Sequence, residues 1–553
     1  MARAMRLSAR DRILPPYTRR VDDWRHAALR LLALGVVLAF ALVYGLAIAI
    51  LPQDYMSMVL LPLLGLLLVV LWLAPDLDPR YDPAVRGLLL AYVFATIVWP
   101  YYLAVDVGGL PWITMNRLFQ TLLLVVAALL FAMSGRARRE MAEVVAAAPL
   151  PARLWLVVLL WGLLLAPLNG TFGFQHHVKF MLATAFLFLV GCLAFRDDRT
   201  LLRLGQVIIA AAVVVSIFGL GERLHGRPIW ADVLPSWLRI EDVGITEFLR
   251  GEMRTLDGRP RVGSSFGIPL YFGEFLGIAS AFILHFLIRS RLLWQKVALG
   301  ALLFFVFVNA HISNARSSWI AVIAGLFAYY FIYAMNRFFR RRREGEIASP
   351  LLVWAIPATF AFMSSAVLFV GRIRVRVLGG GQHSWSDRAR EEQWERAWSA
   401  ALSQPWGHGP GSSGRVIGWG NPEEGRVTVD TTHAWLIVDF GFPGLILFAL
   451  AYLVMAATAL RAALGARNDV ERMALPAFAA IMTFLSTRYG IASWMNIYLV
   501  ALCFALAVAV LWRQRADRAV FDWSEFRTLA PTALVARRGP PPFVPAPAGV
   551  RRP

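Results

Sequence analysis

Four cations in the sequence border apolar runs, at positions where a helix would leave a membrane. They are Arg117, Lys179, Arg316 and Arg488. A guanidinium group is planar and can donate two hydrogen bonds to neighbouring phosphate oxygens, so a set of such groups suits a diphosphate. Long basic side chains also extend from helix ends to the membrane surface without any catalytic role, which explains each cation alone about as well.

A histidine at the end of a long polar stretch is the candidate general base. His433 lies in the sequence Thr431-Thr432-His433-Ala434-Trp435, immediately before an apolar run. An unperturbed imidazole titrates near pH 6.5, so it can accept a proton at neutral pH. The alternative is an interfacial histidine that caps a helix, and position alone slightly favours that alternative.

Two further motifs do not support a cofactor or a metal. Residues 409–414 read Gly-Pro-Gly-Ser-Ser-Gly and fit G-x-G-x-x-G, but they follow no strand and open no clear helix, so a dinucleotide site is not expected. His176 and His177 are adjacent, but no acidic or cysteine cluster accompanies them in the sequence. We therefore expect no metal site and no cofactor.

The elements that must position these residues are long apolar runs. The chain has 553 residues, of which 58% are hydrophobic and 16% charged, and its mean hydropathy is +0.59. Soluble domains carry about 25% charged residues. In lipid the backbone must satisfy its own hydrogen bonds, so runs of about 20 apolar residues form helices. The sequence predicts an all-α polytopic membrane protein with about fourteen transmembrane helices. The expected spans are 29–51, 57–74, 87–105, 113–133, 154–168, 177–195, 204–220, 266–288, 297–311, 317–335, 351–370, 434–460, 474–488 and 491–512.

Charge indicates the orientation of these spans. The formal net charge is +20, almost entirely from arginine. Such a charge can indicate nucleic-acid binding, but the inward loops of membrane proteins also favour Lys and Arg. With both termini in the cytoplasm every short loop agrees with this bias, so we expect no nucleic acid and a multi-pass protein of the bacterial inner membrane. Its outward loops would then face the periplasm.

This orientation divides the chain into seven segments. They are a basic cytoplasmic segment (1–28), N-terminal transmembrane helices (29–220), a first large periplasmic loop (221–265), central transmembrane helices (266–370), a second large periplasmic loop (371–433), C-terminal transmembrane helices (434–512) and a Pro-rich, disordered cytoplasmic tail (513–553). Both cysteines, Cys192 and Cys503, fall inside apolar runs, so no disulfide is expected in the large loops.

The second large loop contains a predicted amphipathic helix. It covers Ser386 to Ala401, and its residues Trp394 and Trp398 are four apart, which places both indoles on one helix face. Pro405 and the glycines that follow it should end this helix in a loop.

Several motifs in this order resemble the bacterial O-antigen ligase and O-antigen polymerase superfamily. The resemblance covers roughly residues 255–460. Ala434 follows the loop histidine where that superfamily often has Asn. The motifs are Arg261-Val262-Gly263-Ser264-Ser265-Phe266, Asn314-Ala315-Arg316-Ser317-Ser318, Ser386-Asp387-Arg388, Trp394, Trp398, Pro405, the Gly-x-Gly pattern of Gly407, Gly409 and Gly411, His433, and Asp439-Phe440-Gly441-Phe442-Pro443-Gly444.

The resemblance implies an inverting, metal-independent glycosyltransferase with a C-type membrane glycosyltransferase fold, whose catalytic loop is 371–433. The implied donor is a glycan on undecaprenyl diphosphate, the implied acceptor is a lipid-linked glycan or lipid A-core, and membrane lipids surround the protein. Fixed guanidinium groups would stabilise the departing diphosphate. We assign this role to Arg261, Arg316 and Arg388, with Arg488 and Lys179 as weaker substrate-binding candidates.

The remaining roles go to the residues around the loop histidine. His433 would deprotonate the acceptor hydroxyl, and Asp439 could orient His433 from one to two helical turns away. Trp394 and Trp398 could stack on sugars, or simply anchor the loop at the interface.

Three functions stay open at this point. A polymerase of O-antigen or exopolysaccharide repeat units is favoured by the number of helices and the size of the second loop. A ligase that transfers the glycan to lipid A-core is the first alternative. A polysaccharide or lipid-linked glycan transporter is the second, although its spans would carry ionisable residues near the bilayer midplane, and here such residues lie near the span ends.

Overall fold

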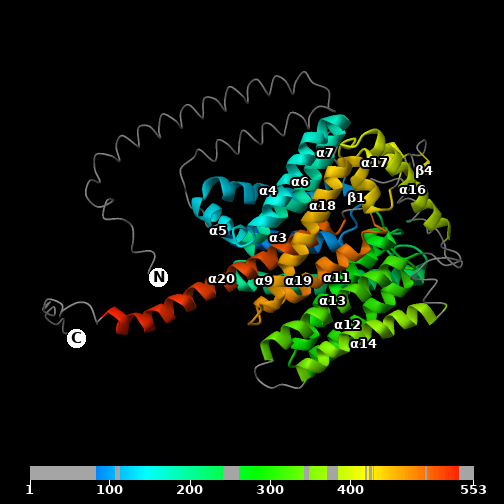
Figure 1. Cartoon of the computed structure of the whole chain (residues 1–553). Coiled ribbons are helices and arrows are strands. Elements are labelled where there is room, and N and C mark those ends of the chain that lie inside the picture. The colour runs from blue at the N-terminus through cyan, green and yellow to red at the C-terminus, as the bar shows by residue number, and fades with distance from the viewer. Residues whose placement is uncertain are drawn as a thin grey trace, which may run out of the picture.

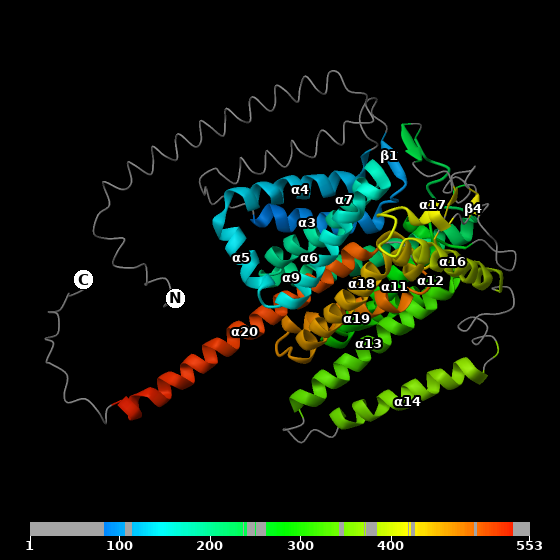
Figure 2. The same ribbon diagram turned by 45° about the horizontal axis from the view of Figure 1, so that its top comes forward.

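The computed structural model describes residues 82–105, 113–235, 237–240, 249, 261–341, 348–369, 371, 384–417, 420–421, 426–427, 429–491 and 495–534. These residues form a bundle of long helices with short strands and a small helical cap at one end (Figures 1 and 2). Among them, eight helices are long and apolar enough to cross a membrane. The predicted spans 29–51 and 57–74 lie outside the described residues, and the number fourteen stays a prediction.

The helices make up most of the described chain. Their bounds are α3 Asp82–Val98, α4 Met115–Met133, α5 Gly135–Val145, α6 Pro149–Leu165, α7 Gly170–Met181, α8 Leu187–Ala194, α9 Asp198–His225, α11 Pro269–Arg289, α12 Leu293–Ile312, α13 Arg316–Arg341, α14 Ala348–Phe369, α16 Ser384–Ser403, α17 Ser413–Ile417, α18 Thr432–Leu464, α19 Ala474–Thr487 and α20 Ile497–Leu534.

Two short antiparallel sheets complete the fold. In the first, β1 (Leu103–Val105) lies between β2 (Ile113–Thr114) and β3 (Leu238–Ile240). In the second, β4 (Gly420–Asn421) pairs with β5 (Arg426–Val427). The predicted span 87–105 is therefore wrong at its end, because α3 stops at Val98 and the chain turns into β1.

One 46-residue helical stretch, Pro149–Ala194, contains a reversal of the chain. Gly170 has φ +58°, which an L side chain rarely adopts, and it lies where α6 gives way to α7. A Cβ added at Gly162 would lie only 2.5 Å from the His177 ring, although a straight helix would separate these residues by about 22 Å. The two arms thus fold back on each other, and they cover the segments predicted as spans 154–168 and 177–195.

The centre of the bundle is built from α11, α13 and α19, which approach closely because small residues face one another. Added Cβ atoms at Gly273 and Gly277 would overlap with Ser318 and Ala321 of α13. Gly325 likewise abuts the carbonyl oxygen of Gly277. Small residues at such contacts let helix backbones come together in lipid, where packing rather than water exclusion drives association.

Helix α18 bends sharply at Gly441, whose φ is +68°. Pro443 has no N–H to donate to the carbonyl of Asp439, and the N–H of Phe442 bonds to the Pro405 carbonyl at 3.0 Å instead of continuing the helix. The carbonyls of Val438 and Asp439 accept the N–H groups of His408 (2.8 Å) and Gly409 (3.0 Å). The bend therefore binds the loop that follows α16, and every backbone group that it releases in this exchange finds a partner.

The predicted tail 513–553 is helical rather than disordered over its first part. Helix α20 continues to Leu534 and projects beyond the rest of the bundle in both views (Figures 1 and 2). Residues 535–553 lie outside the described residues.

Gly441→Ala should destabilise the protein. A Cβ at this position would lie 2.2 Å from the Pro405 carbonyl oxygen, and the left-handed conformation itself costs an L residue about 1–2 kcal/mol. We expect a lower apparent melting temperature for the detergent-solubilised protein. Gly300→Ala is the control, because α12 has open space at Gly300 and alanine is the better helix former. Equal melting temperatures for the two variants would contradict this account of the bend.

Candidate functional site

His433 lies in the first turn of α18, half-buried in an aromatic cluster. Its ring is 4.9 Å from that of Trp394 in an edge contact, and it stacks on Tyr489 at 5.6 Å. Trp398 contacts Trp394 at 5.7 Å and Phe442 at 5.4 Å. The prediction that Trp394 and Trp398 share one face of a helix is confirmed, since both lie on α16 with neighbouring rings.

The start of α18 is attached to the segment that follows α19. The Thr432 N–H bonds to the Arg488 carbonyl at 3.2 Å, and the Thr432 hydroxyl bonds to the Ile491 carbonyl at 2.6 Å. The same segment supplies Tyr489 to the His433 ring. Two helix ends and one loop therefore determine where the imidazole lies.

Helix α16 presents a different arginine to this segment than the sequence suggested. Arg388 is exposed in the first turns of α16, whereas Arg390 is half-buried and its Nη2 lies 3.9 Å from a Cβ built at Gly490. Residues two positions apart are rotated by about 200° around the helix axis, so their side chains point to nearly opposite sides. Sequence analysis missed Arg390, because the motif alone did not show which face of α16 packs on the bundle.

Arg261 and Arg316 come together at the start of α13. The Arg261 Nη2 donates to the carbonyl of Asn314 at 3.2 Å, two residues before Arg316. Asn314 has φ +53°, and this left-handed turn leads directly into α13. The structure thus places two of the predicted cations, 55 positions apart in the sequence, at one helix start.

Glu222 holds the turn that carries Arg261. Its carboxylate, buried at the end of α9, accepts the N–H groups of Gly263 (3.0 Å) and Ser264 (2.7 Å). The Ser265 hydroxyl donates to the Ile97 carbonyl at 2.7 Å and ties the turn to α3. Sequence analysis missed Glu222, although an acidic residue just past an otherwise apolar run was a signal for it.

Arg488 is paired within the protein. It forms an ion pair with Glu274 of α11, whose carboxylate is fully buried and also accepts the Asn496 amide at 3.0 Å. The Arg488 Nε donates to the Phe484 carbonyl at 3.0 Å, and its guanidinium lies 3.7 Å above the Phe484 ring. Because a buried carboxylate neutralises it, we do not carry Arg488 forward as a ligand of a diphosphate.

Asp439 organises the glycine loop. Its carboxylate accepts the N–H groups of Gly411 (2.6 Å) and Ser413 (2.7 Å), the Ser412 hydroxyl (3.1 Å) and the indole N–H of Trp435 (2.7 Å). Among the described residues no hydrogen bond joins Asp439 to His433, so these contacts do not support an orienting role for Asp439, and that role stays a prediction. The G-x-G-x-x-G segment does surround an anion, and that anion is this carboxylate.

The other predicted cations are exposed. Lys179 lies on α7, and Arg388 lies on α16. None of the predicted site residues lines the 340 Å³ cavity found in the described part of the chain, which lies elsewhere in the bundle.

Three groups share one end of the bundle. Arg261 and Arg316 lie where α13 begins, the Glu274–Arg488 pair lies where α11 begins and α19 ends, and the His433 cluster lies where α18 begins. Contacts connect each group to the next. Ser318 of α13 abuts Gly273 of α11, and the neighbouring Glu274 pairs with Arg488. The Arg488 carbonyl in turn accepts the N–H of Thr432 at the start of α18. Figure 2 shows α16 and α17 at this end, over the start of α18.

We call these three groups, Arg261 with Arg316, Glu274 with Arg488, and the His433 cluster, the polar layer. The fold and the polar layer define a class, a polytopic helical membrane protein with arginines and a histidine among aromatic side chains at one end of its bundle. Residues 301–449 match the family described as O-antigen ligase. This match confirms the resemblance of the motifs to the O-antigen ligase and polymerase superfamily, and it supports a membrane glycan-transferring function. Arg316, Arg388, His433 and Asp439 lie inside the matched segment, and Arg261 lies outside it. No curated protein matches the chain significantly.

Asp439→Asn should loosen residues 404–413. In the variant, the side-chain NH2 group would replace one of the oxygens that now accept the N–H groups of Gly411 and Ser413. Each hydrogen bond to a charged group contributes about 1.5–3 kcal/mol, so its loss should weaken the loop. We expect amide hydrogen exchange in this loop to rise about tenfold or more. Asp232→Asn, in an exposed pair with Arg227, is the control and should leave this loop unchanged. Equal protection in both variants would argue against the role given to Asp439.

Proposed function

We propose that this protein transfers a glycan from undecaprenyl diphosphate to a hydroxyl acceptor and so polymerises the repeat units of a surface polysaccharide. The match of residues 301–449 to the O-antigen ligase family supports the transfer of a glycan at a membrane. The observation that carries the proposal is the position of His433. Its imidazole stands between two aromatic side chains, at the same end of the bundle as the Arg261–Arg316 group.

In the proposed reaction the acceptor oxygen attacks the anomeric carbon from the face opposite the diphosphate. The bond from that carbon to the diphosphate oxygen breaks, and its electron pair leaves with the diphosphate. His433 takes the proton of the acceptor hydroxyl. Arg261 and Arg316 stabilise the negative charge that develops on the phosphoryl oxygens. Arg388 is a third candidate for this role, which rests on the motif resemblance and on its exposed position in the second large loop.

The aromatic side chains suit the sugar portion of the donor or acceptor. Trp398 keeps 44% of its surface exposed while its ring contacts Trp394 and Phe442. An exposed indole face beside the proposed base can stack on a sugar ring. We place this site on the periplasmic side of the inner membrane, as the charge of the loops predicts.

A ligase is the second candidate, because the matched family is described as O-antigen ligase. It would use the same donor and the same groups but transfer the glycan to lipid A-core. A transporter has less support. Glu274 pairs with Arg488, and His285 bonds to the Tyr329 hydroxyl at 3.0 Å, so these buried ionisable groups are engaged within the protein rather than open to a pathway.

The acceptor distinguishes the candidates. Purified protein is incubated with undecaprenyl diphosphate glycan, with and without lipid A-core, and the products are separated by size. Longer lipid-linked glycan without lipid A-core identifies a polymerase, and glycan on lipid A-core identifies a ligase. Movement of lipid-linked glycan across vesicles without any transfer product would contradict the proposal.

His433→Ala should abolish glycan transfer in this assay. Removal of a general base typically costs about 100- to 10,000-fold in rate. The amount and monodispersity of the purified variant should equal those of the wild type, since His433 is only half-buried at a helix start. His225→Ala is the matched control, because this exposed histidine bonds within its own helix, at the Gly221 carbonyl. Normal transfer by His433→Ala would remove the assignment.

Arg316→Lys should impair transfer although the charge is kept. Lysine has a point charge and cannot donate two parallel hydrogen bonds to a phosphate as guanidinium does. We expect kcat to fall at least tenfold, measured with saturating donor. Arg227→Lys, in an exposed ion pair with Asp232, is the control and should retain activity. Wild-type turnover in Arg316→Lys would indicate that Arg316 only extends to the membrane surface.

A further inference from the structure

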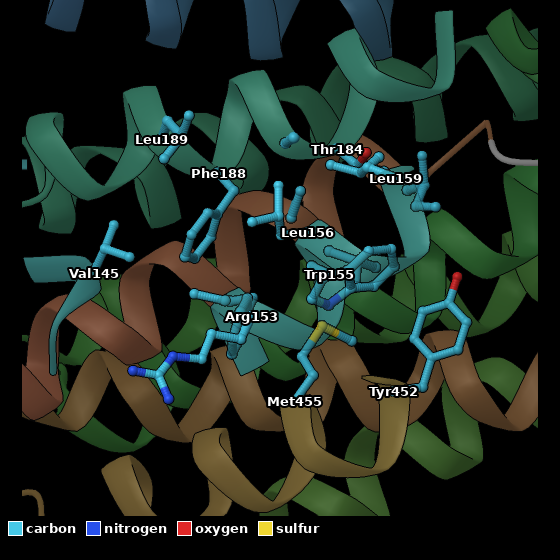
Figure 3. A pocket seen from close by; sticks show the side chains of 16 residues that line it. Val145, Arg153, Trp155, Leu156, Leu159, Thr184, Phe188, Leu189, Tyr452 and Met455 are labelled. Atoms are coloured by element: carbon cyan, nitrogen blue, oxygen red, sulfur yellow. The ribbon is translucent and has the colours of Figure 1, made fainter. Parts of the chain in front are cut away.

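An apolar cavity of about 340 Å³ lies between α6, the α7–α8 junction, α18 and α20. Figure 3 shows Trp155 and Leu159 of α6, Phe188 of α8 and Met455 of α18 around it. None of the proposed catalytic residues lines it. A pocket of this size is large enough for a small ligand or part of a lipid.

The helix between α7 and α8 is widened beside the cavity. Residues Leu182–Phe186 form a π-helical turn, and Thr184 and Ala185 of this turn line the cavity. The Thr184 hydroxyl donates to its own helix, at the Phe180 carbonyl (2.6 Å), so it does not add a free polar group to the wall. Ala152 and Ala501 supply small side chains from the facing helices. π-Turns of this kind often occur at functional positions.

Exposed apolar side chains of α6 lie beside the cavity. Leu156, which lines it, is 55% exposed, and Val157, Leu160 and Leu164 beside it on α6 are exposed as well. An apolar space without polar partners does not hold ordered water, and it offers no hydrogen bonds to a sugar. An acyl chain that enters from the bilayer is the occupant that this wall suits.

One charged side chain stands at the edge of the cavity. Arg153 is the only basic residue among those that line the cavity. Its side chain is exposed, and it forms no hydrogen bond or ion pair with any described residue. Figure 3 shows its guanidinium on the Val145 side and Tyr452 at the opposite side. The guanidinium of Arg153 suits a phosphate.

We propose that the cavity binds one acyl chain of an anionic phospholipid, whose phosphate pairs with Arg153. Basic residues beside a pocket between transmembrane helices are the chemistry that recognises anionic lipid headgroups. The site lies on the side of the bundle that carries the inward cations in the predicted orientation, away from the His433 cluster. It requires no part of the proposed transfer reaction.

The test is native mass spectrometry of the full chain in mild detergent with phosphatidylglycerol or phosphatidylcholine. The wild type should retain one phosphatidylglycerol, at least fivefold more than phosphatidylcholine. Arg153→Gln should remove this preference, whereas Arg139→Gln, an exposed α5 arginine that does not line the cavity, should keep it. Ala185→Phe should reduce retention of both lipids by filling the cavity, and Ala501→Leu provides a milder variant if the first does not fold.

Several outcomes would overturn the proposal. A wild type that retains no phospholipid would indicate that another part of this chain, such as residues 29–74, fills the cavity. Equal loss of preference in Arg153→Gln and Arg139→Gln would show a diffuse surface effect. Displacement of phosphatidylglycerol by undecaprenyl phosphate at equal concentration would assign the cavity to the polyprenyl substrate.

Discussion

The bend of α18 at Gly441 is the constraint on which the polar end of this protein depends. A membrane helix cannot leave its backbone groups without partners, so a break is stable only where other protein groups replace the lost bonds. Here the loop after α16 supplies them, through Pro405, His408 and Gly409. The same contacts hold α16 against α18 and so bring Trp394 to His433.

Buried carboxylates organise the rest of this end, each in a different way. Asp439 collects four donors from the glycine loop and α18, and Glu222 accepts two amides of the Arg261 turn. Glu274 takes the charge of Arg488 across α11 and α19. A buried carboxylate is costly unless it is paired or hydrogen-bonded; Glu274 is paired with Arg488, and Asp439 and Glu222 are hydrogen-bonded. Acidic residues therefore position the site without being proposed to touch the substrate.

The two ends of the bundle differ in chemistry. One end concentrates short polar contacts and positive-φ turns, such as those at Ser264 and Asn314, where arginines are held in defined places. Away from that end, an apolar cavity lies beside α6, next to the widened helical turn between α7 and α8. A rigid polar layer suits the stabilisation of developing charge, and an adaptable apolar space suits a lipid chain.

The sequence by itself determined those features that each segment carries alone. Apolar runs of membrane length predicted the long helices from α4 to α19, and a spacing of four residues placed Trp394 and Trp398 on one face. Motif order also led to the superfamily.

Tertiary structure alone decided which charges are free and which are paired. Arg488 and Glu274 are 214 positions apart, and Asp439 meets donors 26 to 28 positions away. It also decided that Arg390 rather than Arg388 faces the bundle, and that a cavity opens between four helices. Local patterns report the faces of one element, whereas the partner of a buried charge is chosen by how distant elements pack.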